Sequence, residues 1–218
     1  MAIDDWHQRW RENKIAFHET DVNRYLQSYF FDFQLSSEGR IFMPLCGKAH
    51  DITWLADQGY EVIGIELSDI AINAFFSENG LSHQKFQAGS LVLHRAKNIS
   101  IIQGDFFDLT SSVLGECDMV YDRAALIALN FEDRARYVEH MNKLLPKVKN
   151  HFIVNLEYSQ EQMNGPPFSV SKAEIESHYS DQFNIKLLET NDIIEERQTW
   201  KERGLTALTE SVYRLDRK

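Results

Sequence analysis

The sequence predicts an α/β fold built on a mostly parallel sheet of seven strands that ends in an antiparallel hairpin. The stretch from Arg40 to Ser68 reads as a buried strand, a tight loop, a helix, a turn at Gly59 and a second buried strand, which together make a βαβ unit. This alternation of strand and helix continues to about residue 157. Two long β-like runs, FNIKLLETNDIIEE and LTALTESVYRLDR, then close the chain and predict the hairpin.

The N-terminal segment, up to about Asp32, is expected to be helical in two pieces. Trp6 and Trp10 are four positions apart and would share one helix face. After the break at IAFHETD, a second helical stripe of apolar residues follows. We expect residues 1–35 to form a helical lid on a single domain that spans residues 1–218.

The helices and strands after Arg40 are predicted partly from residues that typically begin or end a helix. Pro146 ends the last long helix, and the capping-box pattern from Ser171 to Glu174 opens a short one. Residues 80–97 are polar with two glycines, which predicts an insertion or a lid loop. The strands are expected near 40–45, 60–66, 98–103, 117–122 and 150–157, and the helices near 50–58, 69–79 and 132–145.

Composition excludes several classes of function. The net charge of −10 and the pI near 5.3 argue against nucleic-acid binding and against an anionic membrane surface. No apolar run approaches the ~20 residues of a membrane span, and the charged N-terminus lacks a secretory signal. Two cysteines and scattered histidines offer neither a disulfide framework nor a metal motif. We therefore expect a cytoplasmic monomer without metal, nucleic-acid or membrane partners.

The βαβ unit ends on a carboxylate, Glu66, nineteen positions after Gly47. In a doubly wound sheet, the first loop and the end of the second strand lie side by side where a nucleotide cofactor binds. A carboxylate in that position can accept hydrogen bonds from the paired hydroxyls of a ribose. The sequence therefore predicts a cofactor that contains adenosine.

The loop PLCGKAH indicates which cofactor this is. A nicotinamide or flavin dinucleotide needs G-x-G-x-x-G to hold its pyrophosphate, whereas this loop has one glycine. S-adenosylmethionine has no phosphate, so a single close backbone approach suffices. The third strand ends at Gly104, and Asp105 could accept from an adenine amino group while Phe106 packs on the ring. S-adenosylmethionine is favoured, with a dinucleotide as the alternative.

Several segments, in order, resemble the thiopurine S-methyltransferases, and more closely their bacterial branch. They are the N-terminal W-x3-W with IAFH, then IFMPLCGKAHDITWLADQGYEVIGIELS, GDFFDL, VYDRAALIALNFEDRARYVEHM, GPPFSV, EERQTW and SVYRL. The resemblance runs nearly end to end. It implies a Rossmann-like class I methyltransferase fold and S-adenosylmethionine as the cofactor.

The resemblance also implies cofactor-binding residues. Glu66 would bind the ribose, although an acidic strand end often only faces water. Leu45, through its backbone, and Gly47 would contact the methionine portion. Trp10 would cover the bound cofactor, whereas Trp6 would either do the same or only fasten the N-terminal helix. A tryptophan near a sulfonium adds roughly 0.5–2 kcal/mol of cation–π attraction.

On the acceptor side, the resemblance places Arg123 beside both the cofactor and the acceptor. Arg197 would be a second cation there, although it could simply pair with a neighbouring glutamate. Phe17 and Pro167 would be walls of the acceptor pocket. Cys46 is not expected to be catalytic, because a buried thiol in a tight loop usually packs as a small apolar group.

The expected reaction is transfer of the methyl group of S-adenosylmethionine to aromatic or heterocyclic thiols such as thiopurines, which the resemblance extends to selenium and tellurium compounds. A thiol of lowered pKa is already largely thiolate at neutral pH, so no general base is required. Two alternatives stay open at this point: a dinucleotide-dependent oxidoreductase, and a non-catalytic module that binds S-adenosylmethionine.

Overall fold

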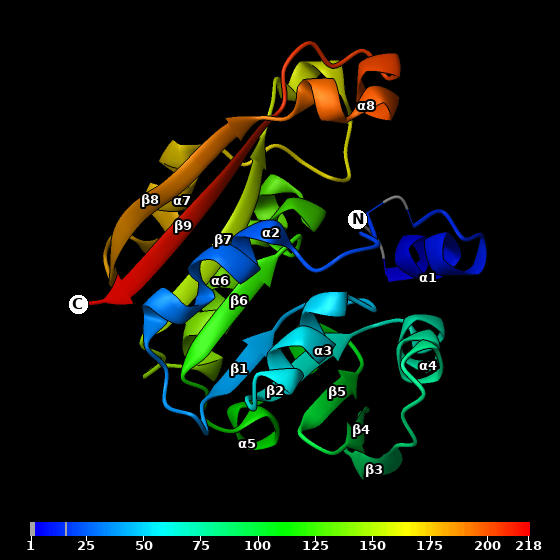
Figure 1. Ribbon diagram of the computed structural model, residues 1–218. Coiled ribbons are helices and arrows are strands. Elements are labelled where there is room, and N and C mark those ends of the chain that lie inside the picture. The colour runs from blue at the N-terminus through cyan, green and yellow to red at the C-terminus, as the bar shows by residue number, and fades with distance from the viewer. Residues whose placement is uncertain (1–2, 16) are drawn as a thin grey trace. The chain divides into compact units, whose positions relative to one another are not determined.

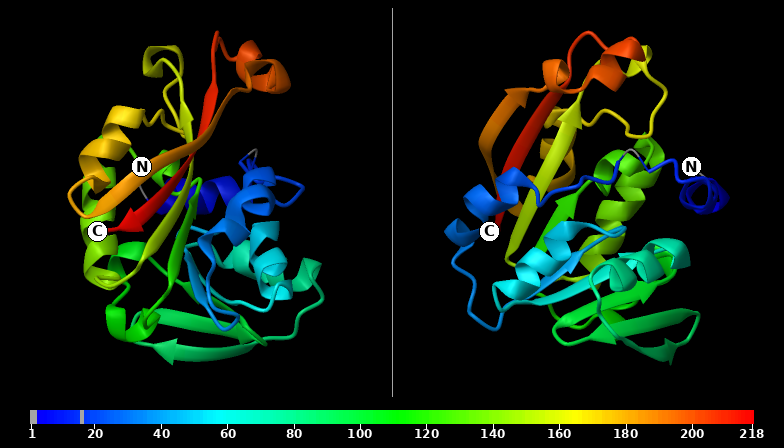
Figure 2. Two further views of the ribbon diagram at one scale, coloured as in Figure 1. Left: turned by 60° about the vertical axis from the view of Figure 1, so that its left-hand side comes forward. Right: turned by 45° about the vertical axis from the view of Figure 1, so that its right-hand side comes forward.

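The computed structural model describes residues 3–15 and 17–218, and the chain divides into two compact units. The first unit comprises Met1–Tyr121 with Met141–Val148, and the second comprises Asp122–His140 with Lys149–Lys218. Both units are drawn in Figures 1 and 2. The expectation of a single domain with an N-terminal lid stays a prediction, and each unit is described by itself below.

The first unit contains the predicted parallel strands. Strand β1 (Arg40–Met43) pairs in parallel with β2 (Glu61–Glu66) and with the start of β6 (Met119–Arg123), and β2 pairs in parallel with β5 (Ile99–Gln103). The strand order in this unit is β3-β4-β5-β2-β1-β6. Apolar side chains on both faces of β1, β2 and β5 are buried, as expected for parallel strands covered by helices.

Residues 80–97 are not the lid loop that was one of the two expectations, because most of them form strands, while the other expectation, an insertion, stays a prediction. Strand β3 (Gln84–Ala88) pairs antiparallel with β4 (Leu91–Ala96), and β4 pairs antiparallel with β5. The hairpin lies at the edge of the sheet of the first unit (Figure 2). The predicted count of seven strands is therefore wrong, since the described residues contain nine, while the α/β class with a closing antiparallel hairpin is confirmed.

The helices of the first unit begin where the sequence supplies a capping side chain. Asn23 accepts hydrogen bonds from the amides of Tyr25 and Leu26 at the start of α2, and Ser68 accepts from Ala71 at the start of α4. The helices are α1 (Ile3–Arg11), α2 (Arg24–Tyr29), α3 (His50–Asp57), α4 (Asp69–Glu78) and α5 (Ser111–Leu114), with 3-10 turns at Phe30–Phe33 and Phe106–Asp108.

The second unit is built on an antiparallel ribbon in the order β7-β9-β8. Its strands are β7 (Asn150–Glu157), β8 (Phe183–Asp192) and β9 (Thr209–Arg217), which confirm the predicted C-terminal hairpin. Helix α7 (Lys172–Tyr179) lies along this ribbon (Figure 2) and begins at Ser171, whose side chain accepts from the amide of Glu174. The other helical segments are α6 (Phe131–Leu144), which ends in the first unit, α8 (Gln198–Glu202), and 3-10 turns at Leu126–Ala128, Gln160–Gln162 and Ile194–Glu196.

An apolar cluster closes one end of the ribbon. Ile193, Ile194, Leu205 and Leu208 are buried there together with Tyr158, and Trp200 packs against them. This cluster holds the segment before α8, which carries Arg197. Among the helices of the described residues, none is long and apolar enough to cross a membrane.

Candidate active site

The loop after β1 makes a sharp left-handed turn. Leu45 has φ +46° and Gly47 has φ +54°. Positive φ is unusual for a branched apolar residue such as Leu45 and costs of order 1–3 kcal/mol. The amide of Cys46 donates to the carbonyl oxygen of Ile65 at 3.0 Å, which fastens the loop to β2. Backbone strain stored in a loop at the carboxyl end of a parallel strand is typical of a ligand-binding turn.

Glu66 holds this loop from the neighbouring strand end. Its Oε2 accepts from the amide of Gly47 at 2.9 Å and its Oε1 from the amide of Ser68 at 2.7 Å. Only 7% of Glu66 is exposed, so the alternative of an acidic strand end that merely faces water is wrong. Burial raises the pKa of Glu66, and the amides of Ser68 and Gly47 act in the opposite direction by favouring the ionised form.

The carboxylate of Glu66 fits the ribose that the sequence predicts. An ionised carboxylate offers about four acceptor positions, and the two backbone amides occupy one on each oxygen. The amide of Leu67 also acts on this carboxylate, and the acceptor positions that remain could receive the neighbouring hydroxyls of a ribose. The same side chain therefore fixes the loop and can still bind a diol.

The end of strand β5 lies next to Glu66. The amide of Gly104 donates to the carbonyl oxygen of Glu66 at 3.0 Å, so the Gly104–Phe107 turn begins directly beside it. Asp105 is half-buried and its Oδ1 accepts from the amide of Phe107 at 2.9 Å. Phe106 is buried, at 3% exposed. Asp105 retains Oδ2 as an acceptor, as an adenine amino group would require.

Trp10 lies against the same loop. A Cβ added to Gly47 would stand 3.4 Å from Cζ2 of Trp10, so the indole covers this glycine directly. Trp10 is 6% exposed and meets the ring of Phe17 edge-on at 5.5 Å, and Trp6 meets the same ring at 5.6 Å. The structure thus brings Trp10, Leu45, Gly47, Glu66 and the Asp105 turn together in the first unit, with Phe17 packed beside Trp10.

The other acceptor-side residues belong to the second unit. Arg123 ends β6 and is followed by Ala124 at φ +69°, a second apolar residue with left-handed backbone at a strand end. The carbonyl oxygen of Pro167 accepts from the hydroxyl of Tyr158 at 2.5 Å. Arg197 lies half-buried at the start of α8, and its neighbour Glu195 is paired with Lys201 at 2.7 Å.

Two buried carboxylates matter here that the sequence analysis did not single out. Asp122, 1% exposed, accepts from the hydroxyl of Tyr137 at 2.6 Å and from the amide of Leu126 at 3.2 Å, and so braces the turn that carries Arg123. Asp51, fully buried in the first turn of α3, accepts from the amide of Asn23 and the hydroxyl of Tyr121. A carboxylate inside the motif VYDRAAL was the available signal for Asp122.

Cys46 is buried, and its non-catalytic role stays a prediction. It is 7% exposed, and burial raises the pKa of its thiol well above the usual value, a shift that the neighbouring Glu66 increases. Its Sγ donates only to the carbonyl oxygen of Gly47 at 3.8 Å. A thiol that stays protonated is a poor nucleophile. Among the described residues, no group of three or more His, Cys, Asp or Glu side chains could hold a metal ion.

Comparison with solved structures shows the fold. The chain superposes on an S-adenosylmethionine-dependent methyltransferase from Anabaena variabilis with a TM-score of 0.65 at 15% identity, covering 99% of this chain and 95% of that one. It superposes on the 1,6-didemethyltoxoflavin-N1-methyltransferase of Burkholderia thailandensis with a TM-score of 0.62 at 13% identity, covering 98% and 87%. The latter structure contains S-adenosylhomocysteine.

Comparison by sequence shows the family and confirms the resemblance. A thiopurine S-methyltransferase family model matches residues 1–218. The chain is 42% identical over 217 residues to a thiopurine S-methyltransferase of Pseudomonas paraeruginosa, covering 100% of both chains. It is 40% identical over 215 residues to one of Nitrosospira multiformis, covering 99% and 98%. The strained loop, the buried Glu66 beside it and these full-length matches agree, and the chain belongs to the thiopurine S-methyltransferase family.

Proposed function

We propose that this protein transfers the methyl group of S-adenosylmethionine to the sulfur of aromatic or heterocyclic thiols, thiopurines among them, and to selenium or tellurium compounds of similar reactivity. The observation that carries the proposal is the buried Glu66, whose carboxylate is hydrogen-bonded to the single-glycine loop at Gly47 and to the amide of Ser68. That arrangement suits a ribose next to a group without phosphate. Membership of the family over the whole chain supports the same reaction.

The cofactor, when bound, supplies a methyl carbon on a sulfonium sulfur that is open to in-line attack. Glu66 would hold the ribose, Asp105 the adenine amino group, and Trp10 would exclude water from the loop at Gly47. Holding the two reacting atoms roughly 3–3.5 Å apart and aligned can supply about 7 kcal/mol or more of the barrier reduction. The chain's task is therefore chiefly positioning.

Arg123 and Arg197 would orient a polarised or anionic acceptor, with Phe17 and Pro167 as apolar walls. A thiolate needs no base, so the arginines have only to hold the acceptor by its polar groups. A guanidinium placed too close to the sulfur would stabilise the thiolate in the ground state and slow its attack. We therefore assign these arginines to the acceptor's other polar atoms.

The test is a methyl-transfer assay with labelled cofactor and a panel of thiol, selenol and tellurite acceptors. Arg123→Ala should lower kcat/KM more than about tenfold, a loss of about 1.4 kcal/mol of transition-state stabilisation. Arg136→Ala is the matched control, because Arg136 also lies in the second unit with its side chain 65% exposed. Unchanged kinetics in Arg123→Ala would remove Arg123 from the site.

The two alternatives of the sequence analysis are not favoured. A dinucleotide oxidoreductase lacks the second and third glycines in the loop at Gly47. A non-catalytic module would bind S-adenosylmethionine and transfer its methyl group to no acceptor of the panel. We also propose that the protein works as a monomer in the cytoplasm and binds no nucleic acid, which the net charge of −10 supports. Light scattering during size exclusion tests the monomer.

A further inference from the structure

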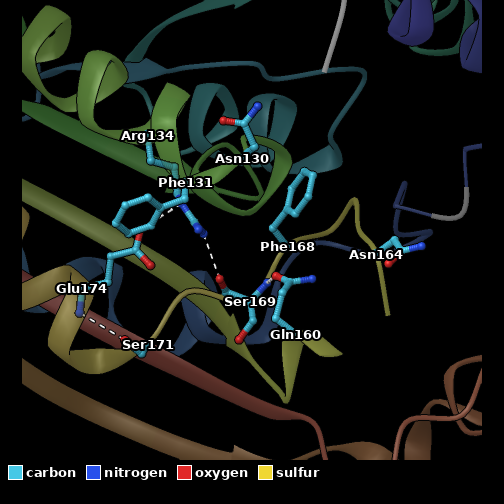
Figure 3. Close-up of a pocket in the computed structure, with 9 residues that line it drawn as sticks. All are labelled: Asn130, Phe131, Arg134, Gln160, Asn164, Phe168, Ser169, Ser171 and Glu174. Atoms are coloured by element: carbon cyan, nitrogen blue, oxygen red, sulfur yellow. Dashed lines mark hydrogen bonds and ion pairs between the residues drawn. The ribbon is translucent and has the colours of Figure 1, made fainter. Parts of the chain in front are cut away.

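The second unit contains a cavity of about 500 Å³ that none of the residues assigned above lines. It lies between the start of α6, the start of α7 and the segment 160–169 (Figure 3). Ligand pockets commonly enclose about 300–1,000 Å³, so the cavity can hold a small molecule. Every residue around it belongs to the second unit, so it is complete without the residues predicted to bind the cofactor.

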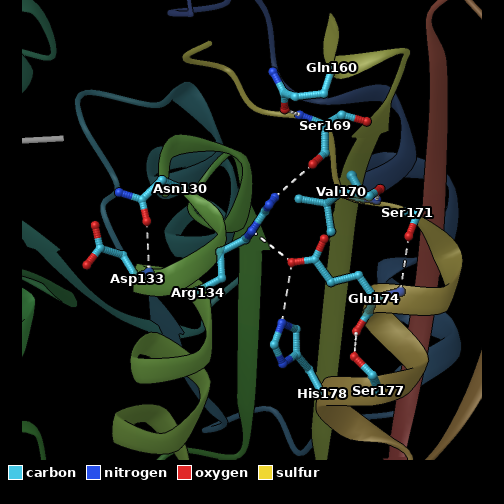
Figure 4. Close-up of polar contacts among 11 residues, drawn as sticks. Asn130, Asp133, Arg134, Gln160, Ser169, Val170, Ser171, Glu174, Ser177 and His178 are labelled. Atoms are coloured by element: carbon cyan, nitrogen blue, oxygen red, sulfur yellow. Dashed lines mark hydrogen bonds and ion pairs between the residues drawn. The ribbon is translucent and has the colours of Figure 1, made fainter. Parts of the chain in front are cut away.

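A buried arginine supplies the polar centre of this cavity. Arg134 is 3% exposed. Its Nη1 donates to the carbonyl oxygen of Ser169 at 2.8 Å, and its Nε pairs with Oε1 of Glu174 at 2.8 Å (Figure 4). Within the described residues, Nη2 has no hydrogen-bond acceptor. Nη2 is not among the fully buried side-chain atoms that lack a partner, so it is accessible and can donate to a ligand that offers an acceptor at this point.

Glu174 makes the cavity formally neutral. Its Oε1 pairs with Arg134 and also faces Nε2 of His178 at 3.4 Å. An anionic ligand next to Arg134 would meet the repulsion of this carboxylate, and a cationic one would meet the guanidinium. A neutral ligand with a hydrogen-bond acceptor on its edge suffers neither penalty.

Two aromatic rings give the cavity its shape. In Figure 3 the rings of Phe131 and Phe168 lie on either side of the Arg134 guanidinium. Phe131 is 70% exposed, and the Arg134 Cζ lies 5.9 Å from its ring centroid. Phe168 is fixed by its amide, which donates to the carbonyl oxygen of Ile127 at 2.6 Å. A planar ring bound in the cavity would stack on aromatic carbon and cover the exposed face of Phe131.

Side-chain amides add directional groups at the rim. Asn130 uses its Oδ1 to accept from the amide of Asp133 at 2.9 Å, which leaves its Nδ2 as a donor. Asn164 is exposed and contributes a second carboxamide. Gln160 holds the loop by accepting from the amide of Ser169 at 2.8 Å. Asn130 and Arg134 therefore both have a donor that a ligand could use.

We propose that this cavity binds a neutral, planar heteroaromatic compound of one or two fused rings, stacked on the exposed ring of Phe131 with a ring acceptor on Arg134 Nη2. The residues that line the cavity do not include Arg123, Pro167 or Arg197, although Phe168 directly follows Pro167. Occupancy of the cavity needs no methyl transfer.

The test is a titration of the full chain, saturated with S-adenosylhomocysteine so that adenosine sites are filled, and followed by protein chemical shifts. The probes are purine, which is neutral with ring acceptors, indane, which has the same shape without acceptors, and benzoate, which is an anion. Purine should bind best. Phe131→Ala should weaken it about fivefold, the size expected for one lost stacking partner.

Matched variants assign the binding to this cavity. Phe86→Ala removes another exposed phenylalanine, 45% exposed on β3, and should leave purine binding unchanged. Arg134→Lys keeps the charge opposite Glu174 but removes Nη2, and should weaken purine binding without unfolding the protein. The shifts are read at Asn130, Phe131 and Phe168, and Arg123→Ala should leave the purine-induced shifts of these residues unchanged even where it weakens purine binding at the predicted acceptor residues.

Three outcomes would overturn the proposal. They are indane or benzoate binding as tightly as purine, the purine-induced shifts of Asn130 and Phe168 lost in Arg123→Ala but kept in Phe131→Ala, and no purine binding at all. None of them bears on the proposed reaction, which is measured separately by labelled methyl transfer.

Discussion

At the scale of single residues, Glu66 combines two roles in one carboxylate. Both of its oxygens accept backbone amides, from Gly47 and from Ser68. In Glu66→Gln one of these amides would face an NH₂ group in place of an oxygen. We expect the variant to lose about 1–3 kcal/mol of unfolding free energy, and about tenfold in affinity for S-adenosylhomocysteine because a charged acceptor is lost.

Calorimetry and urea unfolding measure the two effects separately. Glu61→Gln is the matched control, since Glu61 begins the same strand with a half-exposed side chain paired to Arg40. It should leave cofactor affinity unchanged. Equal loss of affinity in both variants would mean that the Glu66 carboxylate only stabilises the fold.

A second residue-scale prediction concerns Asp122 and pH. Burial raises the pKa of Asp122 from 3.8 to about 6, and the hydrogen bonds from Tyr137 and from the amide of Leu126 act in the opposite direction. Because the folded state then holds this proton more tightly than the unfolded chain does, the contribution to the unfolding free energy falls as pH rises from 3.8 to about 6. Above that range the contribution stays constant at its lower value.

Asp122→Asn removes this titration. The unfolding free energy of the variant minus that of the wild type should therefore increase by about 1 kcal/mol between pH 5 and pH 7.5. Urea unfolding at the two pH values measures it. Tyr137→Phe keeps the Asp122 carboxylate but deletes the hydrogen bond that favours its ionised form. In this variant the fall in unfolding free energy should therefore occur at higher pH. A difference independent of pH would contradict the assignment.

At the scale of elements, the parallel strands and long helices could be predicted because each carries its own signal. The apolar runs of β1 and β2, the cap at Ser171 and the stop at Pro146 are local features. The hairpin of β3 and β4 was missed because nearly every residue of β3 is exposed and shows no alternation. Its pairing partner is β4, which in turn pairs with β5, so the pairing is tertiary.

In the candidate active site, too, local features could be predicted from the sequence and tertiary contacts could not. Glu66 could be predicted from its place after a βαβ unit, but its hydrogen bond to Gly47 could not. The cavity beside Arg134 brings together residues from three segments that lie up to about forty positions apart. No local pattern marks such a constellation.

Helix α1 carries an element-scale prediction. The indole of Trp10 covers Gly47. Trp6 is half-buried and packs against the ring of Phe17. Trp10→Ala should raise the Kd for S-adenosylhomocysteine about tenfold, and Trp6→Ala should raise it less than about threefold, because only the ring of Trp10 would lie on the cofactor. Calorimetry measures both, after thermal unfolding confirms that each variant folds. Equal effects would mean that both rings only fasten α1.

At the scale of the whole molecule, the candidate residues fall on two compact units. Trp10, Leu45, Gly47, Glu66 and Asp105 belong to the first, as does the predicted acceptor wall Phe17, while Arg123, Pro167 and Arg197 belong to the second. Each set is held by contacts within its own unit, such as Glu66 with Gly47 and Pro167 with Tyr158. The two ligands should therefore order different parts of the chain.

Hydrogen exchange tests this division. S-Adenosylhomocysteine alone should slow amide exchange in residues 44–49, 66–68 and 104–107, because those backbones line the predicted cofactor site. A thiol acceptor added to that complex should then slow exchange in residues 123–126 and 165–170. The amides of β8 and β9 are the internal control, since their ladder is complete without either ligand. If the first ligand protected residues 165–170 as strongly as residues 44–49, cofactor and acceptor residues would not act as separate sets.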